Sequence, residues 1–155
     1  MGAMADAIAV FFKRSGLEHH RVDSAFDTPC PDNLILPVQS AMFRTTLCER
    51  NSSFVCHIHA GEELQLCVVN VGLKRSTVPV ARRPAMMEFF TRLNQGMPVG
   101  AFYLGLDSDE ITFRNSVDVL AGTLTPFQIA VLVGRSATEI DTYYPGISGT
   151  TQDTG

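Results

Sequence analysis

Two histidines and a glutamate near the middle of the chain have the residue types of a metal site. His57 and His59 lie in a segment that alternates apolar and polar residues, and Glu63 follows four residues later. Side chains at positions i and i+2 of a strand share a face, so both imidazoles can approach one cation. A complete ligand shell needs another histidine, and the others, His19 and His20, lie upstream in a predicted loop. We therefore favour a solvent-facing histidine pair and expect neither a metal nor a cofactor.

No complete set of residues for nucleophilic catalysis stands out in the sequence. It has no Gly-x-Ser-x-Gly elbow, and no glycine-rich segment is followed by Lys-Ser or Lys-Thr. Cys56 is adjacent to His57, but neighbouring residues of a strand point to opposite faces, so these two side chains cannot pair. We therefore predict that the protein is not an enzyme.

A polar row on another predicted strand allows two interpretations. Arg114, Ser116 and Asp118 alternate with apolar residues and therefore share one face. The first interpretation is a small anion or nucleotide sensor that uses Arg114 and Asp118. The second is a solvated face, whose two charges are too far apart along the strand to interact.

Composition and charge exclude several classes of partner. The 155 residues carry a net charge of −4 from 12 basic and 16 acidic residues, with no basic stripe, so we expect no nucleic-acid partner. No apolar run approaches the roughly 20 residues that cross a bilayer, and the N-terminus lacks the pattern of a signal peptide. We expect a cytoplasmic protein without membrane contact. The four cysteines form no C-x-x-C pair and fit the role of small buried apolar residues.

Hydrophobic periodicity predicts three helices and about five strands. The first helix covers residues 6–15. The second begins with Pro84 as its first residue and ends at Gly96, and the third follows Thr125 as N-cap with Pro126 as its first residue. The strands are predicted at residues 42–49, 53–59, 63–72, 99–106 and 110–119. Between the first helix and the first of these strands, we expect irregular chain with one short extended piece around Arg21 and Val22.

The order α-β-β-β-α-β-β-α indicates an α+β fold with an antiparallel sheet. The strand at 63–72 is apolar on both faces, which predicts a central strand or a second contact. We expect a single domain over residues 1–147. The Gly/Thr/Ser-rich chain after Pro145 is expected to be loose, with residues 148–155 as a flexible tail.

Two surfaces are predicted to bind a partner. The last helix has one apolar stripe that suffices for docking on a sheet, and a second stripe built mostly of small residues. Met87 is the one apolar residue off the stripe of the second helix, so we expect it to be exposed or interfacial. The partner-binding residues predicted in this way are Met87, Phe127, Ala130, Val131, Gly134 and Thr138.

From about residue 47 to residue 147 the chain resembles the YbjN-like family, bacterial proteins described as sensory transduction regulators. The matching segments occur in the family's order and are Phe54-Val55-Cys56, Arg83-Pro84-Ala85, Glu88-Phe89-Phe90-Thr91-Arg92-Leu93-Asn94, Gly100-Ala101-Phe102-Tyr103-Leu104, Ile111-Thr112-Phe113-Arg114-Asn115-Ser116-Val117-Asp118-Val119, Gly122-Thr123-Leu124-Thr125-Pro126 and Tyr143-Tyr144-Pro145-Gly146-Ile147. The resemblance implies a type III secretion chaperone-like fold and brings no catalytic residues with it.

These observations predict a non-enzymatic protein-binding or regulatory module, chaperone-like and homodimeric. The alternative is a metal- or small-ligand-binding protein, or an enzyme, that uses His57, His59 and Glu63.

Overall fold

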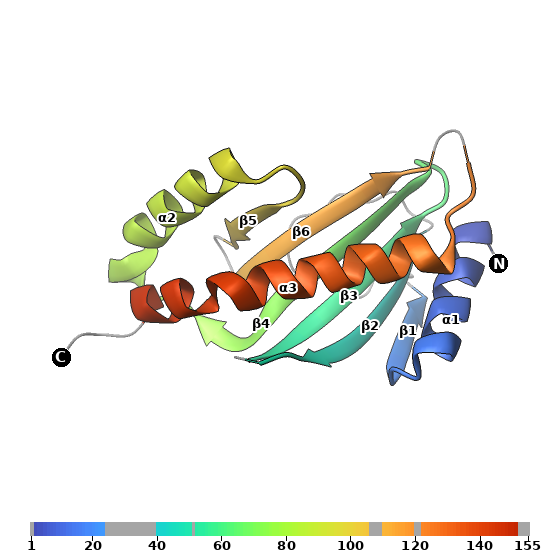
Figure 1. Cartoon of the computed structure of the whole chain (residues 1–155), viewed down its shortest axis with the longest axis horizontal. Helices are drawn as coiled ribbons and strands as arrows, with labels where there is room; N and C mark the ends of the chain where they lie inside the picture. The colour runs from blue at the N-terminus through green and yellow to red at the C-terminus, as the bar shows by residue number, and fades with distance from the viewer. Residues whose placement is uncertain (1, 24–39, 51, 106–109, 120–121, 152–155) are drawn as a thin grey trace.

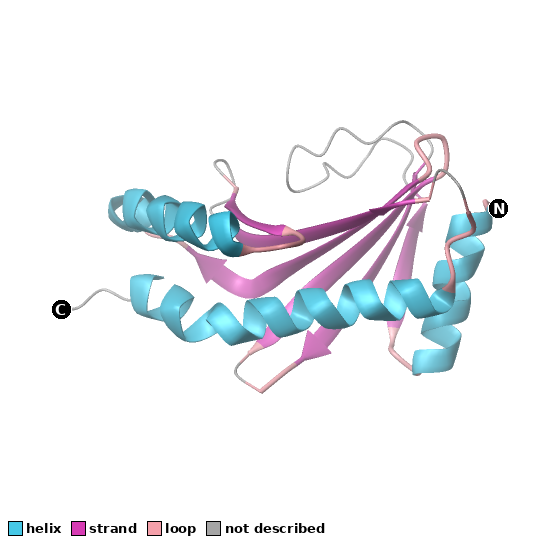
Figure 2. Cartoon of the chain, turned by 45° about the horizontal axis from the view of Figure 1, so that its top comes forward, coloured by secondary structure: helices cyan, strands magenta, loops and turns pink. Residues whose placement is uncertain are grey.

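A computed structural model describes residues 2–23, 40–50, 52–105, 110–119 and 122–151. Its elements form two layers, an antiparallel sheet and three helices that lie against one of its faces (Figures 1 and 2). In chain order they are α1 (Ala3–Ser15), β1 (His19–Asp23), β2 (Ser40–Cys48), β3 (Ser53–Gly61), β4 (Leu66–Thr77), the 3-10 turn η1 (Val80–Arg82), α2 (Arg83–Gly96), β5 (Ala101–Leu104), β6 (Glu110–Asp118) and α3 (Pro126–Thr151). The predicted α+β class is confirmed.

The sheet has six strands where the sequence predicts about five. Their order is β1-β2-β3-β4-β6-β5, and each neighbouring pair is antiparallel. The additional strand is β1, which covers the short extended piece expected around Arg21 and Val22. Its sequence, HHRVD, lacks the apolar alternation of the other strands. The doubly apolar β4 lies in the sheet interior between β3 and β6, as predicted.

Because side chains alternate between the two faces of a strand, every second side chain of the sheet faces the helices. On β3, Phe54, Cys56 and Ile58 are fully buried in this core. The helices add their own apolar stripes, and α3 lies across β4 and β6 (Figure 1). A cluster of aromatic contacts ties the sheet to two helices, since Phe102 of β5 contacts Phe90 of α2, Phe113 of β6 and Tyr143 of α3.

An asparagine of α2 completes the hydrogen bonding of β5. The Asn94 amide nitrogen donates to the carbonyl oxygen of Phe102, and the Phe102 N–H donates to the Asn94 amide oxygen, both at 2.8 Å. Phe102 lies directly opposite Phe113, and in such a non-hydrogen-bonded pair both backbone groups point away from the neighbouring strand. The side chain of Asn94 therefore satisfies both polar groups of Phe102.

Two helix N-termini have side-chain caps. The Glu62 carboxylate, from the β3–β4 turn, accepts hydrogen bonds from the N–H groups of Met4 (2.9 Å) and Ala5 (3.0 Å) at the start of α1. At α3, Thr125 and Gln128 exchange hydrogen bonds in a capping box, which confirms Thr125 as the predicted cap. Negative charge and oxygen acceptors satisfy the free N–H groups of the first helical turn.

Two elements extend beyond their predicted ends. β4 continues through Thr77 although the sequence becomes polar after Gly72. The chain from Pro145 is helical rather than loose, since α3 includes Pro145 and ends at Thr151. A proline costs this helix one backbone hydrogen bond, and burial of the fully enclosed Ile147 offsets that loss. The domain boundary at residue 147 stays a prediction, and residues 152–155 of the expected tail lie outside the described residues.

Candidate functional site

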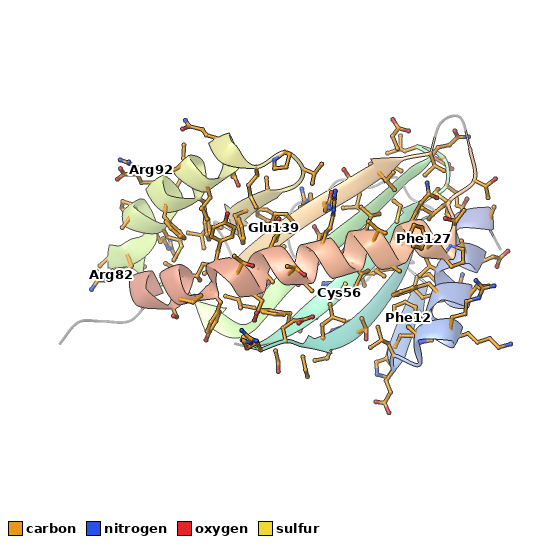
Figure 3. The ribbon with its side chains drawn as sticks, in the orientation of Figure 1. Phe12, Cys56, Arg82, Arg92, Phe127 and Glu139 are labelled. Atoms are coloured by element: carbon orange, nitrogen blue, oxygen red, sulfur yellow. The ribbon has the colours of Figure 1, made fainter. Side chains whose placement is uncertain are left out.

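The outer side of α3 has an exposed stripe of apolar and small residues. Phe127 and Val131 are 76% and 40% exposed, and Figure 3 shows Phe127 near the N-terminal end of the helix. Ala130, Gly134 and Thr138 are exposed as well, and a Cβ added to Gly134 would meet no atom within 4 Å. We call these five residues the α3 stripe. The structure brings together all the sequence-predicted partner residues of this helix.

The opposite side of α3 explains why the stripe is not needed for folding. Ile129, Val133, Ala137 and Ile140 are buried in the core, at 5% exposure or less. This first stripe packs α3 on the sheet, as predicted, and Leu132 and Ile147 of the same helix add to the core. The α3 stripe therefore leaves apolar surface in water that the fold itself does not use.

Met87 is exposed on α2 and belongs to a different surface from the α3 stripe. It is 50% exposed, whereas its neighbour Met86 is fully buried. The same helix also carries the exposed ion pair between Glu88 and Arg92. Such a surface pair contributes little stability. The predicted exposure of Met87 is confirmed, so a partner could reach this side chain. Met87 is on a different helix from the α3 stripe and is not part of it.

The expectation of a solvent-facing histidine pair is wrong for His59. Its side chain lies on the sheet face away from the helices, but it is only 3% exposed, while His57 is half-buried. Burial is the main reason that the pKa of His59 falls to about 4, and the nearby His57 and Arg114 lower it further. His59 is therefore neutral at pH 7. Its Nε2 atom is buried and has no hydrogen-bond partner.

The residues of the metal hypothesis do not converge on one point. Glu63 is exposed in the turn after β3. His19 stacks on Phe12, with ring centroids 4.2 Å apart, on the helix side of the sheet. Across the described part of the chain, no group of three or more His, Cys, Asp and Glu side chains is placed to hold a metal ion. The donor set therefore does not fit a metal centre.

Buried thiols do not supply a nucleophile. Burial raises the pKa of Cys56 and of Cys67 to about 12, so both are protonated at neutral pH. Cys56 is fully buried on the helix side of β3, whereas His57 lies on the other side, as predicted from their adjacent positions. Cys48 is exposed and not in a disulfide.

Arg114 is held in place by two neighbours instead of being simply solvated. Its Nε donates to Asn70 Oδ1 and its Nη2 donates to Tyr103 Oη, both at 3.0 Å. The guanidinium also lies over the Tyr103 ring, 4.7 Å from its centroid. Asp118, the predicted second residue of an anion sensor, is exposed and pairs with Leu66 near the other end of β4. The structure therefore joins Arg114 to Asn70 and Tyr103, not to Asp118.

Strand pairing lines up polar residues across five strands. His20 of β1 pairs with Arg44 of β2, Arg44 with His57 of β3, His57 with Asn70 of β4, and Asn70 with Arg114 of β6. We call these five residues the cross-strand row. All of them lie on the face opposite the helices. The row holds two guanidinium groups and no carboxylate.

The comparisons with known proteins support a regulatory family. The YbjN family, described as "Putative bacterial sensory transduction regulator", matches residues 5–148. No curated protein and no solved structure matches the chain. None of the helices that the structure describes has the length and hydropathy needed to cross a membrane. The match includes all three helices almost to their ends and all six strands, and on this ground the chain belongs to the YbjN family.

Proposed function

We propose that the protein is a non-enzymatic regulatory module that acts by binding proteins, and that it forms a homodimer through the α3 stripe. The observation that carries this proposal is the exposed stripe itself, in which Phe127 has 76% of its surface in water. The family description supports a regulatory role. Among the described residues no group of three or more His, Cys, Asp and Glu side chains is placed to hold a metal ion, which favours this proposal over the metal-binding alternative.

The shape of the α3 stripe favours a second copy of this chain as its occupant. Its large residues, Phe127 and Val131, lie toward the N-terminal end, and the small residues Gly134 and Thr138 follow toward the C-terminal end. In a two-fold interface the same patch must complement itself. Two antiparallel α3 helices that cross near Gly134 would place large residues of each copy against small residues of the other. Glycine at the crossing permits a short distance between the helix axes.

The proposal includes a chaperone-like surface for a protein client around Met87. Methionine adapts to partners of different shape because its side chain is unbranched and polarisable. Val80, in the turn before α2, is 71% exposed and adds apolar area next to this helix. The free cysteines of the described chain fit the reducing cytoplasm, where we place the protein.

A matched pair of variants tests the dimer. Val131 of α3 and Val10 of α1 are both helical valines, with 40% and 39% exposure. Val131→Glu places a charge at the proposed interface, so we expect the dissociation constant of the dimer to rise about tenfold or more. Val10→Glu adds the same charge outside the α3 stripe and is expected to leave the dimer unchanged. Size-exclusion chromatography with light scattering over a concentration series measures both.

Two results would contradict the dimer. One is a monomeric natural chain at every concentration. The other is equal weakening of the dimer by Val131→Glu and Val10→Glu, which would place the contact elsewhere.

The client surface is tested separately, by the aggregation of a chemically unfolded reporter enzyme. We expect the natural chain to slow this aggregation. The Met87→Glu variant should remain dimeric but no longer slow it. If the natural chain does not slow aggregation, the proposed chaperone-like function is refuted.

A further inference from the structure

Helix α2 is held less firmly than the other two helices. Only two of its side chains, Met86 and Phe90, are buried, whereas α1 buries six residues. Side chains cap the N-termini of α1 and α3, but Arg82, the N-cap residue of α2, makes no side-chain cap hydrogen bond. The first turn of α2 has no acidic residue and its last turn has no basic residue, so neither end has a charge that favours the helix dipole. The position of α2 therefore depends on few contacts.

Two aromatic contacts attach α2 to its neighbours. Phe90 stacks on Phe102 of β5, with ring centroids 5.4 Å apart and an interplanar angle of 17°. The Phe89 ring lies against Gly146 of α3, where an added Cβ would come within 2.9 Å of it. Both neighbours, β5 and the C-terminal end of α3, lie at one end of the molecule (Figure 1). A movement of α2 therefore leaves the inner strands in place.

The two hydrogen bonds between Asn94 and Phe102 are the polar contact of α2 with the sheet. They are both 2.8 Å long and join the last turn of the helix to the backbone of β5. When α2 moves away, water replaces the Asn94 amide at both backbone groups of Phe102. Because water takes over both bonds, breaking them costs only a modest free energy. Asn94 therefore has the position and the strength of a reversible latch.

We propose that α2 opens as a unit, with the Asn94–Phe102 pair as its latch, and that the open form takes up apolar segments of an unfolded protein. This inference rests on the proposed function, because it assigns the client to a surface that α2 covers. Opening uncovers Phe102 on β5 and Phe90 on α2, and it makes Met86 accessible beside the exposed Met87. Aromatic rings and flexible methionine side chains accommodate apolar segments of varied sequence.

The chemistry of the uncovered surface selects an apolar client. Met86, Phe90 and Phe102 have at most 3% of their surfaces in water when α2 is closed, so opening without a partner exposes apolar area and is unfavourable. A client that covers the same area removes this cost and shifts the equilibrium toward the open form. Folded proteins bury most of their apolar segments, whereas unfolded proteins expose them. The open form is therefore selective for unfolded chains.

Hydrogen exchange of backbone amides, followed by nuclear magnetic resonance on the full chain, tests the opening. A detached helix of 14 residues is marginal in water, so its amides exchange once α2 is open. We expect the N–H groups of Phe90 and Phe102 to exchange together, with protection about a hundredfold or more below that of Ile140 in α3. Equal protection of Phe90 and Ile140 overturns the proposal, because α2 would then open only in global unfolding.

Asn94→Ala tests the latch, with Gln95→Ala as its matched control, since Gln95 is the next residue and an exposed carboxamide. Alanine is the better helix former in both variants, so a loss of protection in Asn94→Ala reports the lost latch and not a weaker helix. We expect the protection of Phe90 to fall about tenfold or more in Asn94→Ala and not to fall in Gln95→Ala. Equal protection of Phe90 in the two variants overturns the proposal.

The aggregation of the unfolded reporter enzyme tests the client. A larger open fraction raises the apparent affinity, so Asn94→Ala should slow aggregation at about one third of the natural chain's concentration or less, and Gln95→Ala should match the natural chain. If the natural chain slows aggregation and Asn94→Ala is no better, this inference is overturned and the proposed function stands. If no chain slows aggregation, both fail. Should Asn94→Ala fail to fold, the exchange measured on the natural chain decides the question.

Discussion

Ile58 and His59 are adjacent in β3 and almost equally buried, with 0% and 3% of their surfaces exposed, but they face opposite sides of the sheet. Ile58 lies among the apolar side chains beneath the helices. His59 lies beside a second imidazole, that of His57, with ring centroids 6.4 Å apart. The helix-facing side obtains its stability from apolar area removed from water. The other side buries polar groups, so its stability depends on hydrogen bonds, charge and pH.

The largest expected effect comes from breaking the apolar side. Phe113 is fully buried on β6 and contacts Phe102 at a centroid distance of 4.9 Å. Phe113→Ala removes this contact and leaves a cavity, so we expect the free energy of unfolding to fall by about 3–5 kcal/mol. Denaturant titration measures the loss. A loss of less than about 1 kcal/mol would contradict a tightly packed helix-facing core.

The second effect is a pH dependence of the free energy of unfolding, which we expect from His59 on the polar side of the sheet. The pKa of His59 is about 4 in the folded chain, against 6.5 for an ordinary histidine. Because the folded pKa is the lower one, the unfolded chain binds the extra proton between these values. Stability from His59 is therefore fully present above pH 6.5 and decreases as the pH falls to 4, by about 3 kcal/mol in total.

His59→Gln isolates that contribution, since glutamine does not titrate. The pH dependence of the natural chain includes every other titrating group, and the contributions of groups that do not interact with His59 cancel when the two chains are compared. Unfolding free energies measured from pH 7 to pH 4 should therefore fall less steeply in His59→Gln. Parallel curves for the two chains would show that His59 does not keep its neutral form in the folded protein.

The smallest effect concerns one hydrogen bond of the polar side. Tyr103→Phe removes the oxygen that accepts from Arg114 Nη2 but keeps the ring beneath the guanidinium. We expect a loss of about 1 kcal/mol in the free energy of unfolding, since a typical hydrogen bond contributes that much. Thermal unfolding of both chains measures it. No change at all would mean that the ring contact and the hydrogen bond to Asn70 suffice to position Arg114.

The sequence predicts the apolar side of the sheet far better than the polar side. Alternation in a single strand is a local pattern, so Phe54, Cys56 and Ile58 are recognisable as one buried face without any knowledge of their neighbours. Thr125 and Pro126 mark the start of α3 for the same reason, because a capping signal involves residues close in sequence. The weakly patterned β1 could be predicted only as a short extended piece.

The polar cluster could not be predicted, because it depends on how strands are paired. Asn70 and Arg114 are 44 residues apart in sequence, and only the pairing of β4 with β6 brings them together. The sequence placed Arg114 and Asp118 on one face correctly but could not show which of the residues on other strands lies beside Arg114. The burial of His59 has the same origin, since alternation assigns a face and not the depth of burial.

The bond between Asn94 and Phe102 has a consequence for how this sheet meets other molecules. β5 is a terminal strand, and terminal strands can template the addition of a strand from another chain, which is a route to fibrils. An incoming strand would need the two backbone groups of Phe102, and the Asn94 amide already occupies both. Self-assembly at this border therefore requires that α2 first release β5, so one side chain helps to keep the folded protein from polymerising.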